Sequence, residues 1–175
     1  MKVYWLLPLI ALPALAQQAS VLTEYDAVQL FNQVATETAK LAPMIEQINT
    51  ADWVSKGAAS TYAQLKEGAL GQNRSIVREL KDLTQNPRKL SDCLTVLFRL
   101  QSMEMELISL DGGLRKYQNG ALADLISSIL AEGHRNRDKL RQYVVDLTQT
   151  KEQQFEVADK EAQRCRESIS KGRRE

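Results

Sequence analysis

Few side chains in this sequence could carry out chemistry, and most catalytic options depend on one histidine. His134 is the only histidine, so a Ser-His-Asp or Cys-His arrangement would have to use it. Charged residues surround it, namely Glu132, Arg135 and Asp138, a composition typical of an exposed turn. We therefore expect His134 to be an ordinary surface residue and the protein not to be an enzyme.

The histidine, glutamate and methionine residues of the sequence do not follow the spacing of a known metal or cofactor site. A di-iron centre in a helical bundle uses two Glu-x-x-His motifs, and the sequence has none. Haem could be held by one histidine and one methionine, and Met44, Met103 and Met105 offer sulfurs. Methionine at helical spacing more often fills a core. We expect no cofactor, and a haem or small-ligand site is the alternative.

Residues 1–16 have the features of a secretory signal peptide. Lys2 precedes ten uncharged residues, and the small side chains of Ala14 and Ala16 predict cleavage before Gln17. This apolar run is too short to cross a bilayer, which needs about 20 residues. We expect export to the periplasm or the extracellular space, without membrane insertion after cleavage.

Export would place the two cysteines, Cys93 and Cys165, in an oxidising compartment. In an oxidising compartment an even number of cysteines indicates a disulfide, and the alternative is two separate buried thiols. Antiparallel helices pair residues that lie at equal distances from their turn. The midpoint of the two cysteines is residue 129. A Cys93–Cys165 bond therefore predicts a chain reversal near residues 131–136, with the Gly-rich stretch 111–120 as a kink.

Length and charge fit one domain that binds no nucleic acid. Cleavage would leave 159 residues, enough for a single core. The chain has 23 basic and 22 acidic side chains, and Lys2 is the only charged residue before the cleavage site. The mature chain would thus have no net charge, which favours neither nucleic acid nor an anionic membrane. We expect one helical domain over residues 17–170 and a charged, frayed tail over 171–175.

Apolar residues recur at steps of three and four, the spacing of helices that pack along a seam. Capping residues and prolines divide them into helical stretches over 23–48, 62–83, 87–114 with a continuation over 122–130, and 140–169. Pro43 predicts a kink in the first stretch. The sequence predicts an all-α fold, an antiparallel up-and-down four-helix bundle with partly kinked helices, coiled-coil-like seams and one disulfide.

The third helical stretch carries more apolar residues than one stripe can hold. Phe98 and Met105 lie beside its main seam. Such a helix is usually the most enclosed member of a bundle, and less often it docks against another protein. Both interpretations of Phe98 and Met105 remain open on the sequence alone.

A basic group precedes and begins the last predicted helix: Arg135, Arg137, Lys139 and Arg141. It lacks the interleaved aromatic residues of a single-strand binder. Charged residues ordinarily cover the outer face of a helix, which is the simpler interpretation. Contact with an anionic partner is the alternative, and the three arginines join Phe98 and Met105 as a candidate partner surface.

These observations predict an exported, non-enzymatic protein that acts by helix-mediated binding or assembly. The heptad seams support this prediction, because they could pair with another protein or with a second copy of the chain. The alternative is a four-helix bundle that binds haem or another small ligand.

Overall fold

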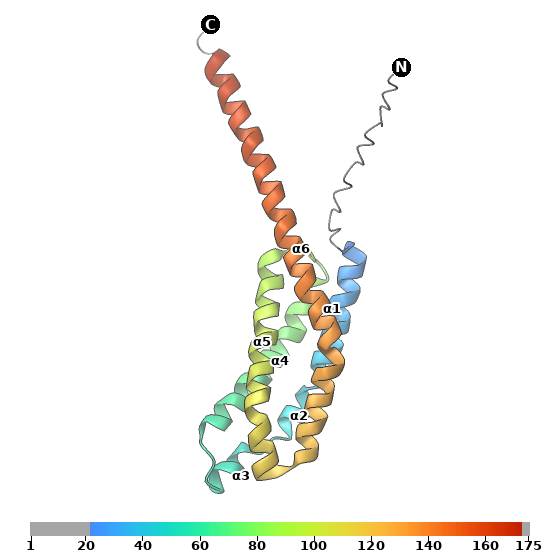
Figure 1. Ribbon diagram of the computed structural model, residues 1–175, viewed down its shortest axis with the longest axis vertical. Helices are drawn as coiled ribbons and strands as arrows, with labels where there is room; N and C mark the ends of the chain where they lie inside the picture. Colours follow the sequence, from blue (N-terminus) through green and yellow to red (C-terminus); the bar gives the residue numbers. More distant parts are fainter. Residues whose placement is uncertain (1–21, 173–175) are drawn as a thin grey trace, which may run out of the picture.

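Helices form all the regular secondary structure in residues 22–172, which are the residues that the computed structural model describes (Figure 1). In chain order they are α1 (Glu24–Ala39), α2 (Ala42–Glu46), α3 (Thr50–Ser55), α4 (Thr61–Leu83), α5 (Leu90–Gly113), the π-helical turn η1 (Leu114–Gln118) and α6 (Gly120–Gly172). The predicted all-α class is confirmed. The predicted signal peptide, with Ala14, Ala16 and Gln17, lies outside the described residues, as do residues 173–175.

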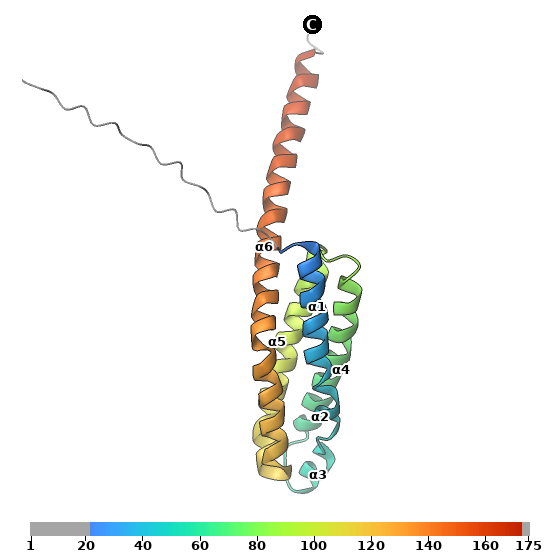
Figure 2. The same cartoon turned by 90° about the vertical axis from the view of Figure 1, so that its right-hand side faces the viewer.

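The long helices pack side by side into a bundle. The helix α4 contacts α1 and α5, and α6 contacts the same two helices from the other side. Figures 1 and 2 show α1 descending to the end where α2 and α3 lie, α4 returning, α5 descending and α6 returning. The prediction of a helical bundle is confirmed for the described residues.

The first helix begins and ends where local chemistry requires. Thr23 caps α1, since its hydroxyl oxygen accepts a hydrogen bond from the backbone N–H of Asp26 at 3.1 Å. Pro43 occupies the first turn of α2, where its missing N–H leaves no helical hydrogen bond unmade. The predicted kink is therefore a full break between α1 and α2.

Buried apolar side chains of all the long helices form one core. The apolar seam predicted for the third helical stretch lies in α5, and its main residues are buried: Val96, Leu100, Met103, Leu107 and Leu110. At one end, the rings of Phe31 and Tyr143 meet edge to face with centroids 5.7 Å apart. At the other end, Trp53 is fully buried and packs edge to face on Tyr62, with centroids 5.4 Å apart.

The chain reverses at η1 rather than at residues 131–136, so the predicted position of the turn is wrong. The Asn119 backbone N–H donates to the carbonyl oxygen of Leu114 at 2.8 Å, which closes the π-helical turn. The Asn119 side chain then accepts from the N–H of Ala121 at 2.9 Å and starts α6. Residues 131–136 lie within α6.

The predicted Cys93–Cys165 disulfide is also wrong, because both cysteines are free. Cys93 is buried in α5, whereas Cys165 is exposed. With the reversal at η1, the residue of α6 level with Cys93 is Tyr143, and Cys165 lies about 33 Å farther along the helix at 1.5 Å per residue. The turn-forming residues Asn119 and Gly120 mark the actual reversal.

Candidate interaction surfaces

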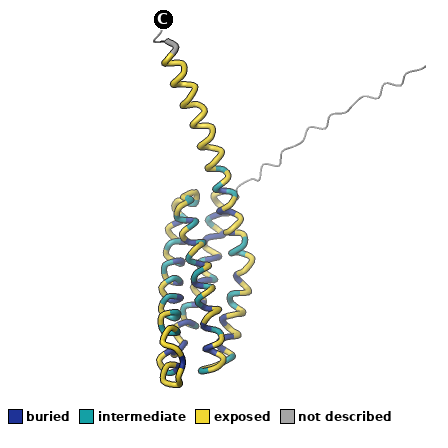
Figure 3. The backbone as a smooth tube through the Cα atoms, turned by 60° about the vertical axis from the view of Figure 1, so that its left-hand side comes forward, coloured by how far each residue is buried: buried dark blue, intermediate teal, exposed yellow. Residues whose placement is uncertain are grey.

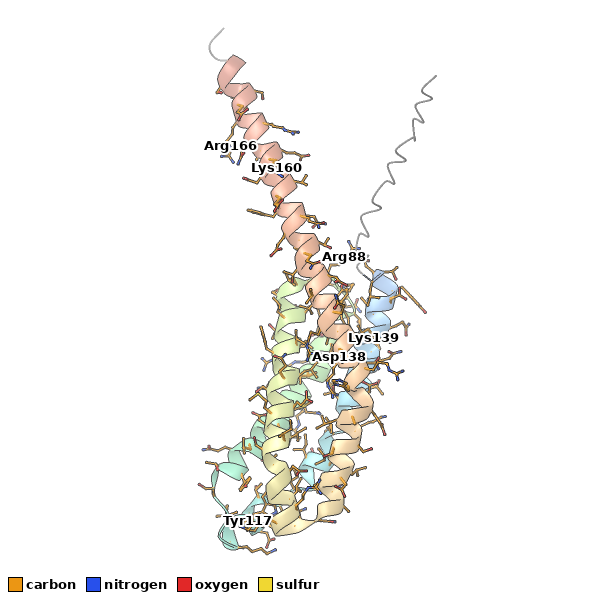
Figure 4. The ribbon with its side chains drawn as sticks, viewed as in Figure 1. Arg88, Tyr117, Asp138, Lys139, Lys160 and Arg166 are labelled. Carbon is orange, nitrogen blue, oxygen red and sulfur yellow. The ribbon has the colours of Figure 1, made fainter. Side chains whose placement is uncertain are left out.

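The last part of α6 projects beyond the end of the bundle (Figure 1). Every residue from 151 to 170 is exposed, as the unbroken yellow in Figure 3 shows. Lys160 and Arg166 lie on this segment, well beyond Arg88 at the end of the bundle (Figure 4). A helix draws most of its stability from packing an apolar face. We call residues 151–172 the α6 extension.

An apolar stripe runs along the α6 extension. Its members follow steps of three and four residues, which place them on one helical face. They are Phe155, Ala158, Ala162, Cys165 and Ile169, and we call them the C-terminal stripe. Phe155 and Ile169 are 74% and 59% exposed. A heptad stripe of this kind is typical of a helix that packs against another helix.

The C-terminal stripe lies on the side of α6 that faces the bundle lower down. Leu140, Tyr143, Val144 and Leu147 are buried on that side. At 100° per residue, the centre of the stripe is rotated by only about 30° from the centre of this buried side. The stripe therefore faces the space beyond the end of the bundle.

A shallow groove joins the stripe to the bundle. Its lining residues come from the start of α5 and from α6: Leu90, Thr148, Lys151, Glu152, Phe155 and Glu156. Phe155 thus stands where the packed part of α6 ends and the extension begins. The apolar surface continues from the bundle onto the extension.

A second apolar surface lies on the outer face of α5. Phe98, Met105 and Ile108 are 62%, 69% and 64% exposed. Their spacing places them on the side of α5 opposite its buried seam. Phe98 and Met105, for which the sequence left core and surface open, are therefore surface residues.

The three arginines of the predicted partner surface have different environments. Arg137 has a side chain only 14% exposed, donates to the carbonyl oxygen of Leu130 and lies 3.8 Å from Glu104 of α5. Arg141 pairs with Asp138 at 3.0 Å, and Arg135 is exposed. Arg137 thus joins helices within the bundle, and the three arginines do not form one basic surface.

His134, Met103 and Met105 do not converge on one site. The His134 side chain is 68% exposed, with Nε2 3.1 Å from Asp138. Met103 is buried with its sulfur 3.8 Å from the Asn73 amide nitrogen, and Met105 lies on the outer face of α5. Within residues 22–172, no group of three or more His, Cys, Asp or Glu side chains could hold a metal ion.

The two thiols differ in reactivity. Burial, together with the nearby charge of Asp92, raises the pKa of the Cys93 thiol to about 11. Its sulfur donates to the Pro87 carbonyl oxygen at 3.4 Å. Because the thiolate is the reactive form, Cys93 is inert at neutral pH and Cys165 is the accessible thiol.

An open groove of about 420 Å³ lies between the start of α1 and the middle of α6. It mixes apolar surface from Leu30 and Tyr143 with the charged side chains of Asp26, Lys139 and Asp146. Lys139 is labelled on α6 in Figure 4. An open groove of this mixed lining encloses less of a small ligand than most ligand pockets do.

The sequence could have revealed the α6 extension through helix length. Once Asn119 and Gly120 are taken as the turn, the 24 residues of α5 can cover only about half of the 53 residues of α6. The last apolar stripe then has no partner in the chain.

None of the helices that the structure describes is long and apolar enough to cross a membrane. Comparison with known proteins gave no match: no protein-family model fits the chain, and no curated protein or solved structure is significantly similar to it.

Proposed function

We propose that this chain is an exported, non-enzymatic assembly protein that binds protein through the α6 extension. The observation that carries the proposal is the C-terminal stripe, an apolar heptad face that is exposed on the part of α6 that extends beyond the bundle. A partner helix that docks on the stripe would both cover its apolar side chains and stabilise the helical extension.

The side chains at the two ends of the stripe provide the driving force. Fully burying a Phe or Ile side chain contributes about 1.5–3 kcal/mol. Phe155 and Ile169 are both largely exposed in the free chain, so each can gain most of this on docking. The alanines between them let a partner helix approach closely.

The rest of the chain holds the extension in place. In the proposed arrangement, an antiparallel up-and-down four-helix bundle anchors the first half of α6 through Leu140, Tyr143 and Leu147, which are buried. The predicted signal peptide would deliver this assembly to the periplasm or the extracellular space.

The outer face of α5 is a weaker candidate for the same function. Phe98 is separated from Met105 by Gln101 and Ser102, so its apolar surface is interrupted. It also belongs to a helix that is already packed on its other side. Isolated exposed apolar residues are common on soluble proteins.

Site-specific photo-crosslinking in the cells that export the protein tests this function. A benzophenone amino acid at Ala162, on the stripe, is expected to give an adduct of one discrete higher mass. The matched position Lys160 lies on the opposite face of the same turn and is expected to give none. Absence of a discrete adduct at Ala162, or equal adducts at both positions, would contradict the proposal.

A further inference from the structure

We infer that the occupant of the C-terminal stripe is a second copy of this chain, whose α6 extension lies antiparallel to the first. This inference rests on the proposed function and names the partner. An interface between two copies related by a twofold axis must be complementary to itself. The geometry, the side-chain sizes and the charges of the α6 extension each meet that requirement.

The direction of the stripe selects the antiparallel arrangement. The stripe continues the side of α6 on which Leu140, Val144 and Leu147 pack against the bundle. A parallel second copy would bring its own bundle into the volume that the first bundle fills. The α6 extension projects beyond the end of the bundle (Figure 1). An antiparallel copy would approach from that end, so the two bundles would lie at opposite ends of the paired extensions.

Side-chain sizes select the register. In an antiparallel coiled coil, each a position of one helix faces a d position of the other. Here Ala162 is an a position and Cys165 is a d position. If these two residues face each other, all facing residues have numbers that sum to 327. Phe155 then faces Gly172 of the second copy, Ala158 faces Ile169, and Ala162 faces Cys165. Each of the two largest side chains meets a small residue, the pairing that fills a helix interface without voids.

Charges beside the stripe select the same register. Asp159 of each copy lies near Arg166 of the other, so two opposite-charge contacts flank the core, and Glu161 lies near the uncharged Ser168. A shift of one heptad in one direction places Asp159 against Asp159. A shift in the other direction places Arg166 against Arg166.

The overall charge of the α6 extension also permits self-association. Residues 151–172 contain five basic and five acidic side chains, so two copies do not repel each other through net charge. Within one copy, the side chain of Gln163 donates to Asp159 at 2.9 Å, and Lys160 lies 3.9 Å from Glu156 away from the stripe. The carboxylate of Asp159 keeps capacity for a second donor.

Cysteine cross-linking of the full mature chain tests both direction and register. The variants A158C and I169C are made separately in a C165A chain, where the buried Cys93 is inert. They are then mixed and treated with oxidised glutathione, which accepts two electrons and two protons as two thiols join. Ala158 and Ile169 are expected to face each other, so the mixture gives a cross-linked heterodimer. Each variant alone does not cross-link, because its two copies of the cysteine lie about 16 Å apart along the axis.

The matched control uses the variants K160C and E167C. The numbers of these two residues also sum to 327, but both side chains lie on the outer face of the extension. Their mixture is expected to stay uncross-linked. Self-cross-linking of A158C alone would show a parallel pair and overturn the inference, and equal cross-linking of the outer pair would show random collision and overturn it. No cross-linking of any pair would also overturn it. In that case, an adduct of Ala162 with a different protein would still support the proposed function.

Discussion

Cys93 and Tyr143 donate to the same acceptor, the carbonyl oxygen of Pro87, with the thiol sulfur at 3.4 Å and the phenol oxygen at 2.8 Å. One residue belongs to α5 and the other to α6, and both lie 25 residues from position 118 at the reversal. This shared acceptor fixes the register of the two helices. It leaves the second half of α6, including Cys165, beyond the end of the bundle.

The two thiols should respond differently to alkylation. We expect iodoacetamide at pH 8 to modify Cys165 where the C-terminal stripe is uncovered, as in the variant A158E/A162E, and to modify Cys93 only after unfolding. With a pKa of about 11, the Cys93 thiol is almost entirely protonated at that pH, and it is buried. Peptide mass spectrometry after timed labelling measures both rates. An intrachain peptide pair joined by Cys93 and Cys165 under non-reducing conditions would contradict the structure.

Tyr143→Phe should remove one hydrogen bond and part of the alkaline pH dependence. The lost bond to Pro87 costs about 1 kcal/mol of unfolding free energy. Burial raises the pKa of Tyr143 to about 12, above its ordinary value of 10. The unfolded phenol therefore loses its proton first, so stability is intact below pH 10 and falls as the pH rises towards 12. Urea titrations over this range should show a smaller fall in the variant, and an unchanged fall would exclude Tyr143 as its source.

Two adjacent glycines at the end of α5 should respond in opposite directions to alanine. A Cβ on Gly113 would lie 2.5 Å from Cζ3 of Trp53, whereas a Cβ on Gly112 meets nothing within 4 Å. G113A should cost about 1–3 kcal/mol through overpacking. G112A should gain up to about 1 kcal/mol from helix propensity. Urea unfolding followed by Trp53 fluorescence measures both, and equal effects would argue against the close packing of Trp53.

Charge reversal should separate the antiparallel pair from a parallel one. D159R or R166D alone places like charges together at two symmetric positions and should weaken the dimer about tenfold, since exposed ion pairs contribute little individually. The double variant D159R/R166D should restore the affinity, because the opposite charges are exchanged. E161R should have a small effect, since Glu161 faces Ser168. Dilution calorimetry measures these affinities, and a large effect of E161R without one for D159R would indicate parallel helices.

Local patterns in the sequence were sufficient to predict the buried faces. The heptad spacing of Ala27, Phe31 and Val34 in α1 corresponds to buried residues in the structure. Stretches with repeated apolar residues specify a helical face whatever their partners are.

The helical conformation of residues 131–136 depends on long-range contacts, which local sequence patterns do not reveal. Gly133 and its polar neighbours had the composition of a turn, yet they continue α6. There, Asn136 donates to Glu37 of α1 at 2.6 Å, and Gly133 leaves room for the Arg137 and Glu37 side chains. The Asn136 amide is thus satisfied across the bundle rather than in a turn, and its partner lies about a hundred positions away in the sequence.

Sedimentation equilibrium of the full mature chain tests most directly whether the C-terminal stripe is a protein-binding surface for a second copy. We predict the mass of two chains for the natural sequence and of one chain for A158E/A162E, which buries charge in the proposed interface. The control Q153E/S170E adds the same two charges on other faces of the extension and should remain a dimer. A natural chain that sediments as a monomer, or an A158E/A162E variant that remains a dimer, would contradict this prediction.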